Sequence, residues 1–485
     1  MSATDAMRLG QLVAEGGDRI VSGFAIDHRK VMPGHVFGAF RGARVNAEDH
    51  IPAAVQAGAI AVVARPQARV SGALHIADAN PRARFAALAG RFFGPYPAHV
   101  AAVTGTNGKT STVELARQLW TLAGHRAASL GTLGLNIGEG AKASGGLTTP
   151  DVVTFLQTLQ GLAAQGIGHV AYEASSHGLD QHRSEGLPVQ AAAFSNLSRD
   201  HLDYHGSMEA YFAAKLRLFT EVLADGGTAV VWADDAPWSA DVMAAVRARG
   251  LRLISVGRAA DAQGLKLVSL TPGPLGQRLE ILADNQACSI ELPLIGAYQA
   301  ANALLAAGLV IATGGGVAAT LADLARLRPV PGRLEHAANN RAGAPVYVDY
   351  AHTPDALAAA AAALRPHTRG RLILVFGAGG DRDTGKRPLM GEVAARVADQ
   401  IIVTDDNPRS EDPAAIRNAI LAAAPSAVTG AQDIADRRAA IAAGIQSAGG
   451  DDVVLVAGKG HEQGQIIGDT VLPFDDAAVA RELCA

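Results

Sequence analysis

The chain has 485 residues, of which 49% are hydrophobic and 18% are charged, and its formal net charge is −4. This length and composition are typical of a globular protein with roughly two to four domains rather than one compact core. The small negative charge argues against a broad basic surface for nucleic acid.

The cysteines and the apolar segments predict a cytoplasmic protein. Cys288 and Cys484 are the two cysteines, and their spacing fits neither a disulfide framework nor a metal site. The N-terminal residues include early acids and lack the apolar segment of a signal peptide. The run Ala303–Thr313 is too short to span a bilayer. We expect no membrane insertion and no nucleic-acid partner, and we also expect a monomer.

Strand-like runs alternate with helical segments along the chain, which predicts α/β architecture with mostly parallel sheets. Residues 1–97 contain no phosphate loop and end in a linker rich in Pro and Gly, Phe93–Pro97. A second break, Pro329–Gly332, separates residues 98–330 from residues 331–485, which have their own strand series. We therefore expect three domains with these limits.

The segment Thr104–Thr110 gives the clearest indication of function. It follows an apolar run and opens a segment whose leucines recur with helical spacing. A glycine-rich turn before a helix offers backbone N–H groups to an anion. Lys109 would then reach the terminal phosphates of a nucleoside triphosphate, and Thr110 would bind Mg²⁺. Val103 stands where a Walker A loop has glycine, so a structural turn with an incidental lysine is the alternative.

Two further apolar runs in the central section end in polar segments. His169–Tyr172 leads to Glu173–Gly178, and Ala191–Phe194 leads to a segment that contains His201. If these strands are neighbours of the phosphate-loop strand, each brings a potential metal ligand beside it. Glu173 suits Mg²⁺, whereas imidazole suits it poorly and a lone histidine is more often structural.

Lys215 lies in the middle of an apolar helix stripe. Ser207 is the predicted N-cap of a helix spanning Met208–Phe219, and the lysine shares one face with aromatic and aliphatic residues. A buried lysine would have a lowered pKa, and its neutral amine could take up CO₂ to form a carbamate suited to Mg²⁺. The alternative is a lysine that reaches the surface along its aliphatic stem.

Three apolar runs in the last section also end in polar clusters. Leu372–Phe376 precedes a cluster with Arg382, Ile401–Thr404 precedes Asp405–Arg409, and Val453–Val456 precedes a cluster with Glu462. Ligands of open parallel sheets bind at the carboxyl ends of the strands. We therefore predict one crevice built from all three strand ends.

Several of these segments together resemble the Mur ligase family of ATP-dependent amide-bond enzymes, across roughly residues 20–480. The matching motifs are Thr104–Thr110, Glu173–Gly178, Asn196–Asp203, Lys215, Gly332–Glu335, Asp349–Asp355 and Asp406–Arg409. The resemblance implies a domain for a UDP-sugar substrate, a central phosphate-loop ATPase, and a C-terminal Rossmann-like domain for an amino acid. It also implies that ATP activates a carboxylate as an acyl phosphate, which the amine of the amino acid attacks.

The resemblance also implies roles for matching positions. ATP would contact Gly105, Thr106, Asn107, Gly108, Lys109, Thr110, Ser111, Asn302 (adenine), Arg333 (γ-phosphate) and Asp349 (ribose). Mg²⁺ would be held by Thr110, Glu173, His201 and Lys215 as its CO₂-derived carbamate, with Lys109, Lys215, His201 and Arg333 serving catalysis. The sugar-peptide substrate would contact His28, Thr148, Thr149, Ser175, Gln181 and Arg183. Without the resemblance, Thr148–Pro150 indicates no more than a helix N-cap.

The third substrate is predicted from Asp406–Arg409. The family's tripeptide-forming branch, which adds meso-diaminopimelate to UDP-N-acetylmuramoyl-L-alanyl-D-glutamate for peptidoglycan, is the most similar. Diaminopimelate differs from lysine by a second carboxylate, which a guanidinium can bind bidentately. The implied contacts are Arg382, Asp406, Asn407, Pro408, Arg409, Gly458 and Glu462.

The sequence also leaves some questions open. His28 stands where the family usually has serine, so the uridine contacts, including the turn Gly42–Arg44, could differ. A lysine-adding ligase, a folate glutamate ligase and a non-catalytic ATP-binding switch are the rival functions. Arg409 speaks against the first two, and the combination of Glu173, His201 and Lys215 speaks against the third.

Overall fold

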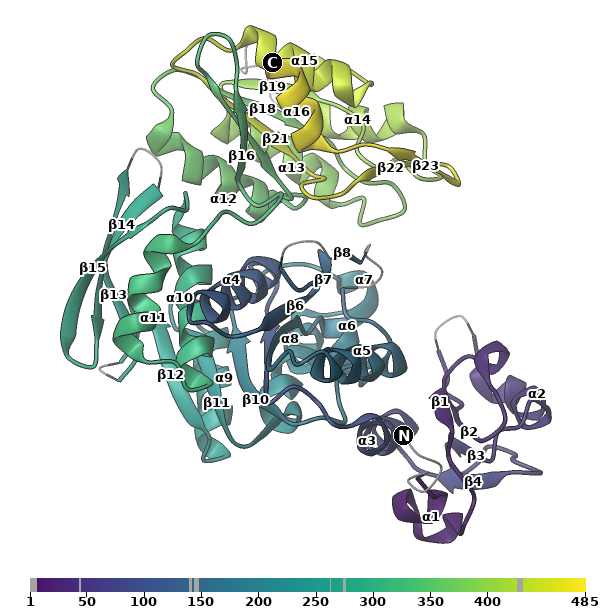
Figure 1. Cartoon of the computed structure of the whole chain (residues 1–485). Coiled ribbons are helices and arrows are strands. Elements are labelled where there is room, and N and C mark those ends of the chain that lie inside the picture. The colour runs from purple at the N-terminus through teal and green to yellow at the C-terminus, as the bar shows by residue number, and fades with distance from the viewer. Residues whose placement is uncertain are drawn as a thin grey trace.

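The computed structural model describes residues 7–42, 45–138, 142–143, 148–261, 263–273, 276–424 and 431–485. Ala43 and Arg44 of the predicted uridine turn lie outside these residues. The strands form sheets of four, eleven and six strands and one two-stranded hairpin. Each of the three larger sheets lies in one of the three predicted sections, and each belongs to a separate body in Figure 1.

The N-terminal body is a small parallel sheet in the order β1-β2-β3-β4. Phe24 of the sheet packs edge-on against Phe85 of α3, with ring centroids 5.3 Å apart. The chain leaves α3 at Phe93 and enters the central sheet at His99, as the predicted linker requires. The elements are α1 (Leu9–Leu12), β1 (Gly23–Ala25), β2 (His35–Gly38), α2 (Ile51–Gln56), β3 (Ala61–Ala64), β4 (Leu74–Ala77) and α3 (Pro81–Phe93).

The central sheet has the order β15-β14-β13-β12-β11-β10-β5-β9-β6-β7-β8. Its middle strands are parallel, while β13–β15 and β6–β8 are antiparallel extensions at the two edges. The strands are β5 (His99–Thr104), β6 (Ala127–Gly131), β7 (Gly134–Asn136), β8 (Lys142–Ala143), β9 (His169–Glu173), β10 (Val189–Phe194), β11 (Leu223–Trp232), β12 (Arg252–Gly257), β13 (Leu265–Gly273), β14 (Gly276–Ala283) and β15 (Gln286–Leu292). Strands β9 and β10 flank β5 on either side, so the condition that brings Glu173 and the segment after β10 beside the phosphate loop is met.

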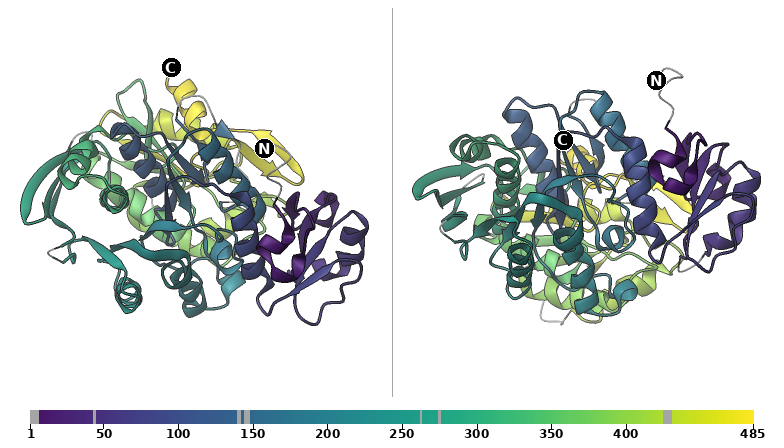
Figure 2. Two further views of the ribbon diagram at one scale, coloured as in Figure 1. Left: turned by 60° about the horizontal axis from the view of Figure 1, so that its bottom comes forward. Right: turned by 90° about the horizontal axis from the view of Figure 1, so that it is seen from below.

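Helices cover both faces of this sheet, as further views show (Figure 2). They are α4 (Lys109–Leu122), α5 (Val152–Ala164), α6 (Ser176–Asp180), α7 (Leu202–His205), α8 (Met208–Arg217), α9 (Trp238–Ala248), α10 (Ala297–Ala312) and α11 (Val317–Asp323). The apolar run around residue 303 belongs to α10, which is buried against α4. No helix in the described part of the chain is long and apolar enough to cross a membrane.

Two local predictions in the central body can be compared with the structure. Ser207 caps α8 by accepting a hydrogen bond from the N–H of Ala210, as predicted, although α8 ends at Arg217 and continues as a π-helical turn. The suggestion that Thr148–Pro150 form a helix N-cap is wrong. Asp151 caps α5, because its carboxylate accepts the N–H groups of the first helical turn.

The C-terminal body has a six-stranded sheet in the order β16-β17-β21-β18-β19-β20. The three strands predicted to form one crevice, β21, β18 and β19, are parallel neighbours. The strands are β16 (Glu335–Asn339), β17 (Pro345–Asp349), β18 (Leu372–Phe376), β19 (Gln400–Val403), β20 (Gln432–Asp433) and β21 (Val453–Ala457), and the hairpin is β22 (Gly464–Ile467) and β23 (Thr470–Pro473). The helices are α12 (Pro354–Leu364), α13 (Lys386–Val397), α14 (Pro413–Leu421), α15 (Arg437–Ser447) and α16 (Asp476–Cys484).

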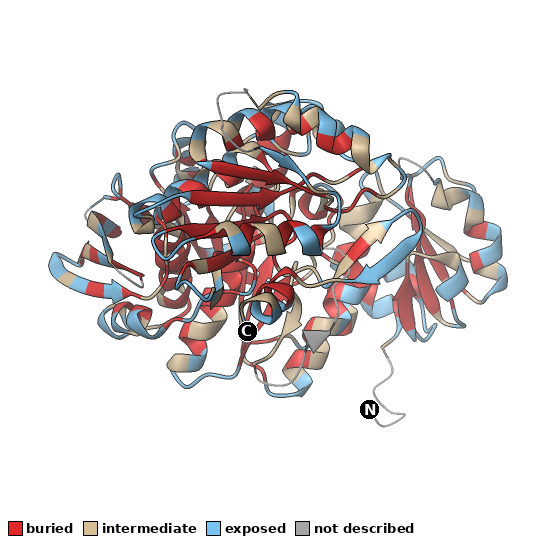
Figure 3. Ribbon diagram, turned by 90° about the horizontal axis from the view of Figure 1, so that it is seen from above, coloured by how far each residue is buried: buried red, intermediate tan, exposed pale blue. Residues whose placement is uncertain are grey.

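Strands β18, β19 and β21 of the C-terminal body are wholly buried, whereas its helices alternate buried and exposed residues (Figure 3). The alanine-rich α12 packs on the sheet through Leu357, Ala360 and Ala361. Helices on both faces explain why these strands read as continuous apolar runs rather than alternating ones. Polar side chains are left for the strand ends, where sites form.

Candidate active site

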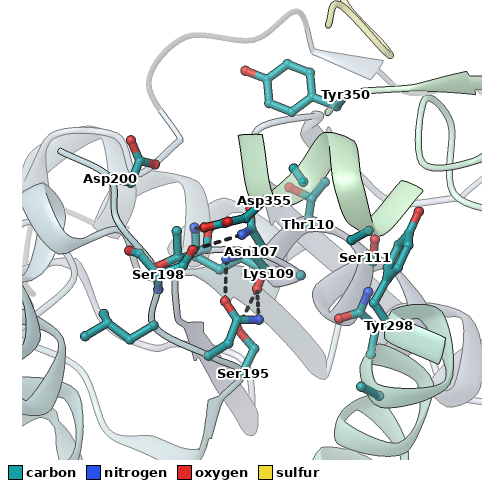
Figure 4. Close-up of a pocket in the computed structure, with 18 of the residues that line it drawn as sticks. Asn107, Lys109, Thr110, Ser111, Ser195, Ser198, Asp200, Tyr298, Tyr350 and Asp355 are labelled. Carbon is teal, nitrogen blue, oxygen red and sulfur yellow. Dashed lines mark hydrogen bonds between the residues drawn. The ribbon is translucent and has the colours of Figure 1, made fainter. Parts of the chain in front are cut away.

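A cavity of about 640 Å³ lies between the central and C-terminal bodies, at the carboxyl ends of the central parallel strands. Its lining includes the phosphate loop, the segments after β9 and β10, one side of α10, and the residues that follow β17 (Figure 4). Of the predicted residues, the cavity brings together Thr106, Asn107, Gly108, Lys109, Thr110, Ser111, Thr148, Glu173, Ser175, His201, Lys215, Asn302, Arg333 and Asp349.

The phosphate loop joins β5 to α4, as predicted. Gly105 has φ +140° and Gly108 has φ +87°, conformations that side-chain-bearing residues rarely adopt. A Cβ at Gly105 would lie 2.0 Å from Ser195 Oγ, and one at Gly108 would lie 2.3 Å from Asn302 Oδ1. Val103 is a buried residue of β5, so the position that differs from a Walker A loop lies in the strand and not in the turn.

The segment after β10 clamps the phosphate loop. Asn196 Oδ1 accepts the N–H of Asn107 at 2.9 Å, and Asn196 Nδ2 donates to the Asn107 carbonyl at 3.1 Å. Ser195 Oγ also donates to that carbonyl, at 2.6 Å. No role was predicted for Ser195 or Asn196 from the sequence. Their position at the end of a strand beside the loop strand was the available signal.

Two lysines converge on one carbonyl oxygen of the loop. Lys109 Nζ lies 2.9 Å from the Gly105 oxygen, and Lys215 Nζ donates to the same oxygen at 2.7 Å. Lys215 is 1% exposed and lies over the ring of Tyr211. Desolvation lowers the pKa of both lysines, and the charge of Lys109 helps to hold the pKa of Lys215 well below its ordinary value. The buried lysine is therefore confirmed, and the surface-reaching alternative is wrong.

The residues predicted to hold Mg²⁺ offer suitable donors. Glu173 is 1% exposed, and its carboxylate accepts hydrogen bonds only from neutral donors, the N–H and Oγ1 of Thr132. A buried carboxylate with neutral partners retains charge that a divalent cation can balance. Thr110 Oγ1 and the His201 imidazole line the same cavity. Desolvation lowers the pKa of His201 to about 4, so its ring is neutral at pH 7.

The described residues contain no group of three or more His, Cys, Asp or Glu side chains arranged to hold a metal by themselves. Mg²⁺ usually keeps several waters and binds through one or two carboxylates together with substrate phosphates. The residues present therefore fit a hydrated Mg²⁺ completed by a nucleotide. Asp200, which the sequence analysis did not select, adds a further carboxylate to the cavity wall.

The connection between the two bodies contributes Arg333. Its Nη2 donates to Thr110 Oγ1 at 3.1 Å, and its guanidinium lies over the ring of Tyr350. Asp349 Oδ2 accepts the N–H of Leu334 at 2.7 Å, and burial raises the pKa of Asp349. A residue of the C-terminal body thus contacts the start of α4 directly.

The predicted sugar-peptide residues form one cluster, except for His28. Arg183 donates to the carbonyl of Thr149 at 3.2 Å and to Gln181 Oε1 at 2.7 Å. Thr149 Oγ1 lies 3.0 Å from Ser175 Oγ. Thr148 Oγ1 lies 3.2 Å from that of Thr132. His28 instead stacks on His50 in the N-terminal body, with centroids 4.2 Å apart.

The strand ends that are predicted to form a crevice in the C-terminal body, called the crevice below, carry Arg382 and Arg409. Arg409 Nη1 donates to the Gly380 carbonyl at 2.8 Å, and Arg382 donates weakly to that of Asp381 at 3.4 Å. A Cβ added at Gly379 would lie 2.9 Å from Arg409 Nη1 and 4.0 Å from Arg382 Cγ. Within the described residues, neither guanidinium forms an ion pair. Hydrogen bonds from Ser410 and, more weakly, the charges of Arg409 and Arg382 lower the pKa of Asp381, so this carboxylate balances part of their charge. Two arginines near one another still favour an anionic ligand group.

A buried polar network forms the opposite part of the crevice. Asn407 Nδ2 donates to Glu462 Oε2 at 2.8 Å, and Lys459 Nζ donates to Asn407 Oδ1 and Glu462 Oε2 at 3.0 and 2.9 Å. Lys459 is fully buried, whereas the Glu462 side chain is 33% exposed. Asp406 and Pro408 lie in the same loop, and Gly458 follows β21. No role was predicted for Lys459 from the sequence, although it lies three residues before Glu462.

The crevice and the cavity are linked at one point. Lys386, at the start of α13, donates from Nζ to the carbonyl of His352, which lines the cavity. Burial lowers the pKa of Lys386, while Asp200 and Asp406 act in the opposite direction. A lysine thus lies between a carboxylate of the cavity and one of the crevice.

The fold and the two sites define a phosphate-loop nucleotide-binding protein with a separate Rossmann-like domain. Residues 103–310 match the Mur ligase middle domain, and residues 332–460 match the Mur ligase glutamate ligase domain. The UDP-N-acetylmuramoyl-L-alanyl-D-glutamate–2,6-diaminopimelate ligase of Zymomonas mobilis is 56% identical, with 99% of each chain covered. The ligase of that name from Bradyrhizobium diazoefficiens is 49% identical, covering 96% of this chain and 95% of the relative.

A solved structure of a ligase with the same name superposes with a TM-score of 0.73 at 32% identity, covering 99% of each chain. The chain belongs to the Mur ligase family. The resemblance found in its motifs is confirmed, as is the mostly parallel three-domain α/β fold.

Proposed function

We propose that the chain is an ATP-dependent ligase that joins meso-diaminopimelate to UDP-N-acetylmuramoyl-L-alanyl-D-glutamate in peptidoglycan precursor synthesis. The names of the full-length relatives support the reaction. The observation that carries the choice of amino acid is the position of Arg382 after β18 and Arg409 after β19, where each guanidinium donates to a backbone carbonyl and neither forms an ion pair among the described residues.

The reaction has two bond-forming steps. A carboxylate oxygen of the sugar-peptide attacks the γ-phosphorus of ATP, and the bond from that phosphorus to ADP breaks. The amine of the amino acid then attacks the acyl carbon, loses a proton, and displaces phosphate. The first step is needed because a carboxylate resists attack by an amine. Positive groups must screen the repulsion between ATP and that carboxylate.

The cavity supplies those positive groups. We assign the phosphate contacts to the backbone of Gly105–Ser111, to Lys109 and to Arg333, the adenine contact to Asn302 and the ribose contact to Asp349. Because Lys109 bonds to carbonyl oxygens of its own loop, it must turn toward the nucleotide when ATP binds. Arg333 can move from Thr110 to a phosphate without a large displacement of the chain.

Thr110, Glu173, His201 and carbamylated Lys215 would hold Mg²⁺. When bound, the metal would neutralise phosphate charge and orient the phosphates. The carbamate forms when the neutral amine of Lys215 attacks CO₂, making an N–C bond and releasing one proton. The burial of this amine and its lowered pKa support that step. The carbamate would replace an ammonium group by an oxygen anion in the cavity.

The remaining substrate would bind across the N-terminal and central bodies. We assign Thr148, Thr149, Ser175, Gln181 and Arg183 to its peptide and sugar portions, and His28 to its uridine portion. We also propose that the three domains span residues 1–97, 98–330 and 331–485. The proposal further includes a cytoplasmic location, a monomeric state and roles in cell shape and cell division. The acyl phosphate and the amine approach each other when the bodies close.

The crevice favours diaminopimelate over lysine. The far carboxylate of diaminopimelate would bind Arg409 and Arg382, and the adjacent ammonium would bind Glu462. Lysine would leave the arginines without an anion. A site built for a polar group rejects a ligand that lacks it by large factors, because the buried partners remain unpaired.

The test is phosphate release by the purified protein with ATP, Mg²⁺, the UDP-muramoyl dipeptide and either diaminopimelate or lysine. We expect release with diaminopimelate and little with lysine. No release with either amino acid would exclude the ligase function. Release with lysine alone would overturn the choice of amino acid and leave the ligase chemistry intact.

A further inference from the structure

The β22–β23 hairpin is not part of the six-stranded sheet, yet it is attached to the loop that follows β19. Its two strands pair antiparallel with each other, from Gly464 opposite Pro473 to Ile467 opposite Thr470. An isolated parallel bridge joins Ile467 to Arg409. In Figure 1 the hairpin extends from one side of the C-terminal body. It therefore supports the Asp406–Arg409 loop from outside the sheet.

The backbone of the hairpin holds both sides of Arg409. The N–H of Arg409 donates to the Ile466 carbonyl at 3.1 Å, and its carbonyl accepts the N–H of Gly468 at 2.8 Å. The N–H of Ile466 donates to Asn407 Oδ1 at 2.9 Å. Asn407 and Arg409, both assigned to the amino acid, are thus held by hydrogen bonds to β22 and to the turn that follows it.

Arg409 needs this support because of its conformation. Its φ is +53°, in the left-handed region, which is unfavourable for a residue with a side chain. The adjacent hydrogen bonds favour this conformation over the extended alternatives. The direction of the Arg409 side chain, and hence the position of its guanidinium beside Gly380, depends on that backbone conformation.

Gln465 ties the start of the loop to the hairpin. It is 9% exposed, and its Nε2 donates to the carbonyl of Asp406 at 2.9 Å and more weakly to that of Asp405 at 3.4 Å. These carbonyls follow the end of β19. A buried carbonyl without a donor is costly, so the amide of Gln465 both satisfies and fixes this segment.

We propose that the β22–β23 hairpin sets the enzyme's selectivity for diaminopimelate, with Gln465 as the positioning residue. Gln465 acts through Asp406–Arg409, and its Nε2 reaches the backbone of that loop rather than a ligand. This inference rests on the proposed function. It deepens that function by assigning selectivity to a segment outside the crevice wall.

The experiment compares Gln465→Ala and Gln465→Glu with the wild type. Alanine removes the donor, whereas glutamate keeps the shape and turns a carboxylate oxygen toward the two carbonyl oxygens. Gln463→Ala is the matched control, because Gln463 lies two residues away and is exposed. The measured quantities are kcat, the KM of each of the three substrates, the ratio of activity with diaminopimelate to activity with lysine, and the melting temperature.

We expect both Gln465 variants to raise the KM of diaminopimelate by about 10- to 100-fold, since a displacement of about 1 Å can cost that much. The KM values of ATP and of the UDP-muramoyl dipeptide should stay within about twofold. The ratio that favours diaminopimelate should fall, and Gln463→Ala should match the wild type.

Three results would overturn the inference. The first is an unchanged KM for diaminopimelate in both variants. The second is a general loss of structure. Either an equal rise in the KM of all three substrates or a large fall in melting temperature with an unchanged ratio of activities would show it. The third is a wild type that releases no phosphate with diaminopimelate, because the proposed function then fails and the inference fails with it. The wild-type assay therefore separates the two failures.

Discussion

The nucleotide cavity and the amino-acid crevice are built in opposite ways. The cavity takes its polar groups from two bodies, and Lys109, Lys215 and Arg333 bond to the chain's own carbonyl and hydroxyl oxygens. The crevice lies within one body, where Asn407, Lys459 and Glu462 form a closed network.

This difference separates a site that must rearrange from one that is preorganised. We expect Lys109 and Arg333 to exchange their present partners for phosphate oxygens when the nucleotide binds, and Arg333 to transmit that exchange to the C-terminal body. The crevice has its donors and acceptors in place, and less ordering is needed when the amino acid binds. Substitutions in the cavity should therefore affect mainly kcat, and those in the crevice should affect mainly the KM of the amino acid.

The largest effect is expected for Lys109→Met in the cavity. Methionine keeps the aliphatic length and removes the charge that stabilises the transferring phosphoryl group. We expect kcat to fall about 1000-fold, which is the upper range for losing one preorganised donor. Steady-state phosphate release measures this loss. Lys266→Met is the control, because Lys266 is an exposed lysine of the same body. A loss below tenfold would contradict the role of Lys109.

The next effect is expected for Lys215→Ala. Loss of the carbamate should lower kcat by about 100-fold, in the range observed when the support of a metal site is removed. Short carboxylic acids should restore part of the activity in this variant and none in Lys109→Met. Isotopically labelled CO₂ retained by the wild type and not by the variant would be an independent readout. Failure of rescue together with absence of label would exclude the carbamate.

Arg409→Ala should change one KM in the crevice. A charge-assisted hydrogen bond contributes about 1.5–3 kcal/mol, which corresponds to about a 10- to 150-fold rise in the KM of diaminopimelate. The KM of ATP should remain within about twofold. Arg396→Ala, at an exposed position of α13, is the control. An equal rise for ATP would mean that the two sites are coupled, and would contradict the separation of cavity and crevice.

The smallest effect is expected at the opposite end of the central sheet. His169 is stacked between His99 and His125, and desolvation and then these two rings lower its pKa to about 4. Between pH 6.5 and about 4, the imidazole of His169 is therefore protonated in the unfolded chain and neutral in the native state. This group lowers stability as the pH falls through that window and has no effect above it.

In His169→Gln, the acid loss of stability should be shallower by up to about 1.4 kcal/mol for each pH unit in this window. Urea unfolding followed by tryptophan fluorescence measures it, because Trp120, Trp232 and Trp238 all lie in the central body. The KM values of the substrates should be unchanged, since His99 and His169 lie at the ends of β5 and β9 that face away from the cavity. An unchanged pH dependence would contradict the buried neutral state of His169.

Sequence alone predicted the parts of both sites that follow from strand ends. Three apolar runs of the last section became adjacent strands, and of the two alternatives left open for Lys215 the structure has the buried one. The phosphate loop was clear because its glycines adjoin both a strand and a helix. Local patterns of this kind need no knowledge of distant contacts.

The remainder depended on contacts between distant segments. Asn196 holds the loop residue Asn107 across 89 positions, and Gln465 holds Asp406 across 59. Neither residue type is unusual at the end of a strand. The capping of α5 was also mistaken, because Asp151 competes with the threonines before it and forms the better cap. The contact of His28 with the uridine portion stays a prediction that rests on the family pattern.

The single-domain construction of the crevice has an evolutionary consequence. Every side chain assigned to the choice of amino acid, from Arg382 to Glu462, lies on one side of the connection at Pro329–Gly332, as does the hairpin that supports them. Mutation within the crevice can alter this C-terminal third of the gene without changing the residues of the phosphate loop. A lineage can thus inherit the same energy-coupling machinery while it acquires a different amino acid for its cell wall.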